Sequence, residues 1–161
     1  FQQSASTQSA HYSPTFDAAP QDETADRERI LIHVSDSPST AGLIRRGRRV
    51  ADFLRADCFA VAVVPGSRLA SLPRERRESL ERHLDFARRL HIDTRILEAE
   101  DSAEALTSFA RTNGITQIFL LKPRFPKYRL LAPRKELAMR VIRAARDLQV
   151  TVVADRHTTR S

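Results

Sequence analysis

The stretch Ile30-Leu31-Ile32-His33-Val34-Ser35-Asp36-Ser37-Pro38 passes from a short, largely apolar run into a polar turn. Four more runs of this kind follow, at Cys58–Val64, Thr94–Leu97, Ile118–Leu121 and Val150–Ala154. The segments between them carry apolar residues at helical spacing, so strands and helices are expected to alternate. Parallel strands need such crossovers, and near-continuous apolar runs are typical of strands buried on both faces. The sequence therefore predicts an α/β fold with a five-stranded parallel sheet.

Four helices are predicted between the strands. They span about Thr40–Arg55, Pro73–Leu90, Ser102 to the Asn113-Gly114 stop, and Arg134–Leu148. The apolar face of the last helix is expected to bury four residues, Leu137, Val141, Ala144 and Leu148. The arginines of the first helix lie mostly off its apolar face, which favours a solvated basic surface made of Arg45, Arg46, Arg48 and Arg49.

The 161 residues suit one domain with a sizeable core. Residues 1–28 are polar and lack hydrophobic periodicity, so we expect a flexible linker or tail there and a folded domain over 29–161. Because the chain does not begin with Met, we also expect a segment upstream. No apolar run is long enough to span a membrane. The lone Cys58 is interpreted as a small buried hydrophobe, which favours a reducing, cytoplasmic setting.

The charge is distributed unevenly along the chain. The net charge is +7, yet residues 1–28 hold five acidic residues and one arginine, a net of −4, so the remainder carries +11. Such a surface attracts phosphates, nucleic acid or anionic lipids, although an arginine-rich codon bias explains the composition equally well. Nucleic-acid binding rests on charge alone and is not favoured. The histidines show no metal-ligand spacing and no nucleophile is paired with a base, so neither a metal site nor an enzyme is predicted.

The segment after the fourth strand is the expected place for a ligand, because open α/β sheets bind ligands beyond the carboxyl ends of their strands. Lys122–Lys135 contains six basic residues, three prolines, no acidic residue and no glycine. This composition favours either an anion contact or a solvated basic loop. The candidate contacts are its basic side chains, Lys122, Arg124, Lys127, Arg129, Arg134 and Lys135.

Over about Arg29–Asp155 the order of elements and the local sequences resemble the universal stress protein family. The closer likeness is to the universal-stress-like domain of KdpD-type potassium-sensing histidine kinases. Three stretches carry it: Ala60-Val61-Ala62-Val63, the arginine-rich Arg74–Arg89 and the basic loop with Phe125 and Tyr128. The resemblance implies an adenine-nucleotide alpha hydrolase-like fold, with strand order 3-2-1-4-5 and helices on both faces. It also implies a role in stress response or signalling.

Nucleotide-binding members of this family carry Gly-x2-Gly, nine residues and Gly-Ser/Thr after the fourth strand, where backbone N–H groups cradle phosphates. Here Leu121 stands at the first glycine, and Pro133 and Arg134 occupy the region of the final pair. The family's aspartate at the end of the first strand is replaced by Ser35. These exchanges predict a degenerate nucleotide site, and ATP bound in the usual mode is not expected.

Some KdpD-type domains bind cyclic di-AMP through a Ser-x-Ser pair and a later Phe-Thr-Ala-x-Tyr. Ser35 and Ser37 match the first part, whereas Cys58-Phe59-Ala60-Val61-Ala62 keeps only the alanine of the second. Ser-x-Ser is also an ordinary strand end and helix cap, and both interpretations stay open.

The sequence thus predicts a non-enzymatic regulatory or stress-response module that acts by dimerisation or by binding a partner. Members of the family commonly dimerise through the fifth strand, which implies a homodimer edge at Val150, Val152 and Val153. The alternative is a sensor domain that binds ATP or cyclic di-AMP through Ser35, Ser37 and the basic loop. An upstream domain or a membrane protein is the other partner we expect, and no other cofactor is predicted.

Overall fold

The computed structural model describes residues 27–66, 68–122 and 137–154. Its elements follow one another as β1 (Arg29–His33), α2 (Thr40–Leu54), β2 (Asp57–Val64), a short 3-10 turn η2 (Leu69–Ser71), α3 (Arg74–Arg89), β3 (Asp93–Glu98), α4 (Ser102–Thr112), β4 (Gln117–Lys122), α5 (Leu137–Ala144) and β5 (Gln149–Ala154). All five predicted strands are confirmed, each to within one residue of its predicted bounds.

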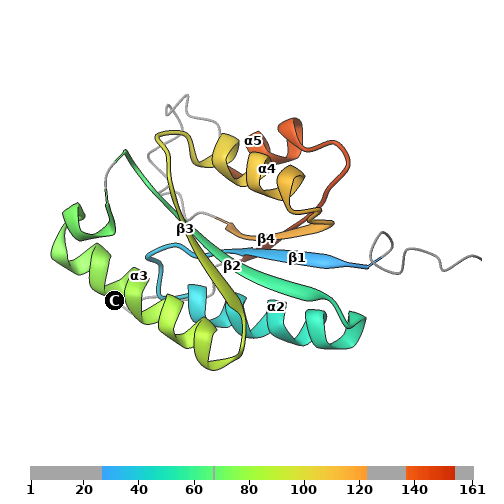
Figure 1. Ribbon diagram of the computed structural model, residues 1–161, viewed down its shortest axis with the longest axis horizontal. Helices are drawn as coiled ribbons and strands as arrows, with labels where there is room; N and C mark the ends of the chain where they lie inside the picture. Colours follow the sequence, from blue (N-terminus) through green and yellow to red (C-terminus); the bar gives the residue numbers. More distant parts are fainter. Residues whose placement is uncertain (1–26, 67, 123–136, 155–161) are drawn as a thin grey trace, which may run out of the picture.

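The five strands form one parallel sheet in the order β3-β2-β1-β4-β5, which confirms the predicted topology. β1 is central, with Ile30 beside Cys58 of β2 and Ile32 beside Phe119 of β4. The chain first builds outward to β3 and then crosses back to β4, so the direction of winding reverses between β1 and β4. Because crossovers between parallel strands are right-handed, this reversal puts α2 and α3 on one face and α4 and α5 on the other (Figure 1).

β1 contributes to the hydrophobic core on both faces of the sheet. Ile30 and Ile32 pack in the cluster under α2 and α3, and Leu31 packs in the cluster under α4 and α5. All three side chains are completely buried. Burial of a side chain of this size contributes roughly 1.5–3 kcal/mol, which explains why the run tolerates no polar alternation.

α2 approaches β1 closely because Gly47 has no side chain at the point of contact. A Cβ atom at this position would lie 2.3 Å from Cδ1 and 2.6 Å from Cγ1 of Ile32. Ile32 is itself fully buried, so it has little room to move away. Leu43, Ile44 and Ala51 bury the rest of this helix face. Gly47 therefore sets the distance between the helix and the central strand.

The predicted last helix is wrong at its C-terminal end. α5 ends at Ala144 instead of Leu148, and Ala144 is exposed whereas Ala145 is buried. The chain turns here because the N–H of Gln149 must donate to the carbonyl oxygen of Thr116 (3.0 Å) for β5 to pair with β4. The predicted start of this helix, residues 134–136, lies outside the described residues.

The residues just before β1 already contact the sheet. Arg27 forms an ion pair with Asp57 (3.6 Å), whose N–H donates to the carbonyl oxygen of Glu28 (3.3 Å). The hydroxyl of Thr116 donates to the Glu28 carboxylate. The remainder of the predicted tail, residues 1–26, lies outside the described residues, so the predicted domain boundary stays a prediction.

Substitution of Gly47 tests the contact between α2 and β1. Gly47→Ala should lower the free energy of unfolding by about 1–3 kcal/mol, because the added methyl group overpacks a buried site. Gly42→Ala is the matched control on the same helix, where the nearest atom to an added Cβ is Nη2 of Arg45 at 3.9 Å. That variant should be stabilised by about 0.5–1 kcal/mol. Urea unfolding measures both, and equal stabilisation of the two variants would contradict the close approach.

Candidate functional site

The carboxyl ends of β1, β4 and β5 meet at one edge of the sheet, next to the reversal of strand order. Ile32 pairs with Phe119, so Ser35 and Lys122, each three residues further on, reach the same level. Lys122 in turn pairs with Ala154 at the end of β5 and is exposed. The structure therefore brings the Ser-x-Ser turn and the first basic residue of the loop to one edge. The other predicted contacts lie outside the described residues: Arg124, Lys127, Arg129, Arg134 and Lys135.

The hydroxyl groups of the Ser-x-Ser turn form hydrogen bonds within the turn itself. Oγ of Ser35 accepts from the N–H of Ser37 (3.3 Å) and lies 2.9 Å from Oγ1 of Thr40. Oγ of Ser37 accepts from the N–H of Ser39 (3.2 Å). These bonds stabilise the turn that leads into α2, but they are not helix caps, because Ser39 at the N-cap position forms no side-chain capping hydrogen bond. Binding of a ligand by Ser35 and Ser37 stays a prediction.

A cavity of about 600 Å³ opens at this edge, between the first half of α2 and the ends of β4 and β5. Leu121 and Val153 form its apolar side. Three arginines, Arg45, Arg46 and Arg49, belong to its lining, and none of the described lining residues is acidic. Among the described residues the lining is Pro38, Ser39, Ala41, Gly42, Leu43, Arg45, Arg46, Arg49, Leu121, Val153 and Ala154. Guanidinium groups bind phosphate oxygens in bidentate fashion, so the cavity suits an anion.

These arginines were not predicted as site residues, because the sequence favoured a solvated basic surface. They are exposed, and α2 places them beside the ends of β4 and β5, where they line the hollow. The spacing of Arg45, Arg46 and Arg49 places them on one side of a helix, which is the signal that could have found them. Arg45 also lies over the ring of Phe86, 5.8 Å from its centroid. Arg48 is turned to Asp52 instead, at 2.7 Å.

Three side chains of α3 contact the Ser-x-Ser turn. Arg76 pairs with the Asp36 carboxylate (3.2 Å), and the hydroxyl of Ser79 donates to the Asp36 carbonyl oxygen (2.8 Å). His83 is buried beside Ser35, and its Nδ1 has no hydrogen-bond partner among the described residues. Burial lowers the pKa of His83, and a hydrogen bond with the backbone of Ser35 acts in the opposite direction. The position of the turn thus depends on α3 as well as α2.

The remaining reactive groups are placed for packing. Cys58 is buried, as predicted, and burial raises the pKa of its thiol to about 11. A thiol with this pKa stays protonated at neutral pH and is a poor nucleophile. Within residues 27–66, 68–122 and 137–154, no three His, Cys, Asp or Glu side chains are grouped so that they could hold a metal ion. No helix in these ranges is long and apolar enough to cross a membrane.

The predicted dimer edge lies on β5, at the end of the sheet. Val150 packs toward α4 and α5, and Val153 packs toward α2, both partly buried. Val152 is 39% exposed. Pairing of two copies along this strand stays a prediction.

Comparison with known proteins confirms the predicted resemblance. The chain is 26% identical over 137 residues to a protein of Synechocystis sp. (strain ATCC 27184 / PCC 6803 / Kazusa) that is named as a sensor protein, KdpD. The match covers 81% of this chain and 35% of that protein, so the chain spans about a third of its relative's length. No family model matches the chain.

Solved universal stress proteins have the same fold. One, from Archaeoglobus fulgidus in complex with dAMP, has a TM-score of 0.55 at 16% identity, and the match covers 78% of this chain and 97% of that one. Another, in complex with cAMP, has a TM-score of 0.60 at 15% identity, with 80% and 97% covered. At these identities the likeness establishes the fold alone, a five-stranded parallel sheet with helices on both faces.

Two histidines beside this edge, the half-buried His33 and the buried His83, predict a pH-dependent stability. Burial lowers the pKa of His33 to about 4 and also lowers that of His83. In the unfolded chain both groups titrate near about 6.5. Below that pH the unfolded state binds more protons than the folded state, so stability falls as the pH decreases. For His33 alone the loss is about 3 kcal/mol at pH 4, measurable by urea unfolding between pH 7 and 4.

His33→Asn removes this titrating group and should reduce the loss of stability between pH 7 and 4. The matched control is His91→Asn, at an exposed position with φ of 60°, a conformation that Asn tolerates. The control should keep the wild-type pH dependence. If His33→Asn loses as much stability on acidification as the wild type, burial of a neutral His33 is not the cause.

Proposed function

We propose that the chain is a non-enzymatic regulatory module of the universal-stress type that acts by association, first of all with a second copy along β5. The nucleotide site of glycine-loop members is degenerate in this chain. The whole sequence contains four glycines, and none follows Gly114. A glycine loop that binds phosphates therefore cannot form after β4. Association with another protein chain is the better-supported function.

The observation that carries this proposal is the concentration of exposed apolar side chains on the last two elements. Among the described residues, six large hydrophobic side chains are exposed, and three of them lie within residues 137–154. These are Met139 (44%), Ile142 (42%) and Val152 (39%). An edge strand with unpaired backbone groups and apolar neighbours is a ready template for pairing with another strand.

Two copies joined along β5 would also change the cavity beside α2. Leu121 and Val153 line that cavity and are only partly buried in a single chain. A second copy placed against β5 would lie next to this open face and could shield the two side chains from water. Removal of apolar surface from water drives such association at about 25 cal/mol per Å².

A charged side chain on β5 tests the association. Wild-type protein should sediment as a dimer, and Val152→Lys should raise the dimer dissociation constant at least about tenfold, a change of about 1.4 kcal/mol. Sedimentation equilibrium at several protein concentrations measures it. The matched control is Ile96→Lys, because Ile96 is 40% exposed on β3 at the opposite edge of the sheet. A monomeric wild type, or equal dissociation of both variants, would overturn the proposal.

A second candidate function, recognition of an anionic nucleotide, is favoured by the arginine cavity. Arg45, Arg46 and Arg49 line the cavity at the carboxyl edge of the sheet, and solved proteins of the same fold are in complex with dAMP and with cAMP. Guanidinium side chains could replace the missing glycine backbone as phosphate donors, with the N-terminal end of α2 beside them. ATP and cyclic di-AMP are the ligands to test. Such a module would then act as the sensing part of a larger protein, as the similarity to KdpD suggests.

Thermal unfolding tests this second function. At a hundred times its dissociation constant, a bound ligand stabilises the fold by about 2.7 kcal/mol, so ATP or cyclic di-AMP should raise Tm by several degrees. Arg46→Ser/Arg49→Ser should remove the shift. The matched control is Arg82→Ser/Arg89→Ser, two exposed arginines of α3 with the same loss of charge. The absence of a Tm shift with either ligand, or an equal loss of the shift in both double variants, would contradict nucleotide recognition and favour association.

A further inference from the structure

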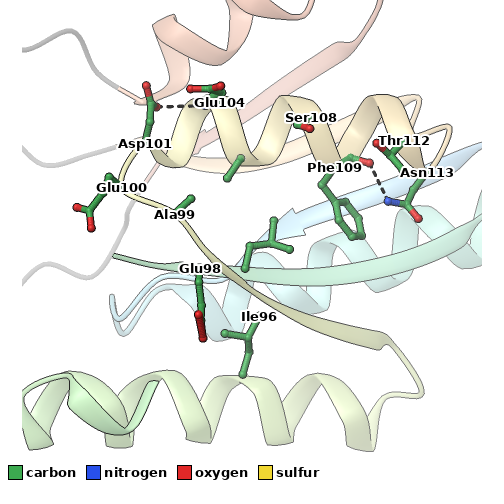
Figure 2. A pocket seen from close by; sticks show the side chains of 12 residues that line it. Ile96, Glu98, Ala99, Glu100, Asp101, Glu104, Ser108, Phe109, Thr112 and Asn113 are labelled. Atoms are coloured by element: carbon green, nitrogen blue, oxygen red, sulfur yellow. Dashed lines mark hydrogen bonds between the residues drawn. The ribbon is translucent and has the colours of Figure 1, made fainter. Parts of the chain in front are cut away.

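The opposite edge of the sheet carries a second hollow, which no part of the proposed function uses. It has a volume of about 680 Å³ and runs between β3 and α4. Figure 2 shows Phe109 pointing down from α4 toward β3, with Ile96 and Glu98 on the far side of the strand. The hollow thus follows the edge of β3. Its lining is Ile96, Leu97, Glu98, Ala99, Glu100, Asp101, Glu104, Ala105, Ser108, Phe109, Thr112 and Asn113.

The floor of this groove is apolar. Leu97 of β3 and Phe109 of α4 are partly buried against the core cluster under α4 and α5. The Phe109 ring meets the ring of Phe59 edge-to-face, with centroids 5.9 Å apart. Ile96 is 40% exposed at the strand edge. Aliphatic side chains of an added strand would therefore find apolar contacts on either face of β3.

One end of the groove is acidic, in a chain whose net charge is +7. Glu98, Glu100, Asp101 and Glu104 line this end, and none of the described lining residues is basic. Asp101 caps α4 by accepting from the N–H of Glu104 (3.1 Å) and also pairs with Arg140. The carboxylates of Glu98, Glu100 and Glu104 form no ion pair within the described residues. Within the described part of the chain, the charges of these three carboxylates are therefore not offset by an ion pair.

The backbone of β3 is available on its outer side. In the strand order, β3 has one neighbour, β2, with which it pairs from Asp93 to Glu98. Every second peptide group of such an edge strand points away from the sheet and can bond to an added strand. The groove therefore offers main-chain hydrogen bonds, apolar contacts and negative charge along one line.

We propose that this groove binds an extended, basic segment of a partner protein, added as a strand along β3 with its aliphatic side chains over Phe109 and its Lys or Arg side chains at the acidic end. Charge complementarity selects this occupant. An acidic segment would be repelled by Glu98, Glu100 and Glu104. The groove lies at the opposite edge of the sheet from β5, so both surfaces can be occupied at once.

Fluorescence anisotropy with labelled heptapeptides tests the proposal on the full chain. The probe is Arg-Val-Arg-Val-Arg-Val-Arg, and the comparison peptide has Glu in place of every Arg. The basic peptide should bind and the acidic one should not. A third peptide, the basic probe with alternate peptide nitrogens methylated, keeps the charge but cannot pair as a strand, and it should bind at least about tenfold more weakly. Failure of the basic peptide to bind, or binding of the acidic or the methylated peptide as tight as that of the basic one, would overturn the proposal.

Two variants in the groove and one control variant on α3 test where the peptide binds. Glu98→Gln/Glu104→Gln should weaken the basic peptide roughly tenfold. Glu75→Gln/Glu81→Gln on α3 has the same change in charge and should leave the affinity unchanged. Ala105→Arg fills the groove and should abolish binding, with circular dichroism as the check on folding. Equal weakening by the two glutamate pairs would show attraction to overall charge alone and contradict a site on β3.

Discussion

Both faces of β1 must be covered by helices, and the rest of the fold follows from this requirement. Ile30 and Ile32 need α2 and α3 on one side, and Leu31 needs α4 and α5 on the other. Right-handed crossovers meet both needs only if the chain winds outward in one direction, returns, and winds outward in the other. The reversal between β1 and β4 is thus the consequence of a strand that is apolar throughout. Gly47 allows α2 to lie close enough to complete the burial.

A central β1 leaves β3 and β5 as the two edges of the sheet, and the helices do not extend over either edge completely. Next to β5 the open face meets the arginines of α2, and next to β3 it meets the carboxylates at the start of α4. The two hollows have similar volumes and opposite charge. A small sheet of this kind can therefore carry two association surfaces of different specificity without any change in its core. The carboxyl edge between them is where open α/β sheets bind ligands, and the sequence has no glycine after Gly114.

The fold was predictable from the sequence because each apolar run coincides with a strand of the sheet. A run such as Cys58–Val64 has apolar residues on both faces of the strand, and only a parallel sheet between two layers of helices buries both. The end of α5 was not predictable, because Leu148 keeps the helical spacing although β5 must begin at Gln149. Pairing with β4, a contact distant in sequence, decided that boundary. Local periodicity carries no information about it.

The candidate sites were less predictable than the fold. Arg45, Arg46 and Arg49 read as a solvated surface because helical spacing tells which face is polar but not whether a neighbouring helix covers the sheet beside it. Glu98, Glu100 and Glu104 become a cluster only once β3 is known to be an edge strand next to α4. Ser35 and Ser37 illustrate the reverse case, since their hydroxyls are engaged in the turn. Sequence motifs drew attention to one edge of the sheet, whereas the side chains that form each hollow could be identified only from the structure.

The claim that β5 is the association edge can be tested most directly by hydrogen–deuterium exchange at increasing protein concentration. If two copies pair along β5, the amide groups of residues 149–154 should exchange more slowly as the concentration rises, while those of residues 93–98 on β3 stay unchanged. Exchange in β5 that is independent of concentration while the protein is dimeric, or protection that appears on β3 instead, would contradict the account.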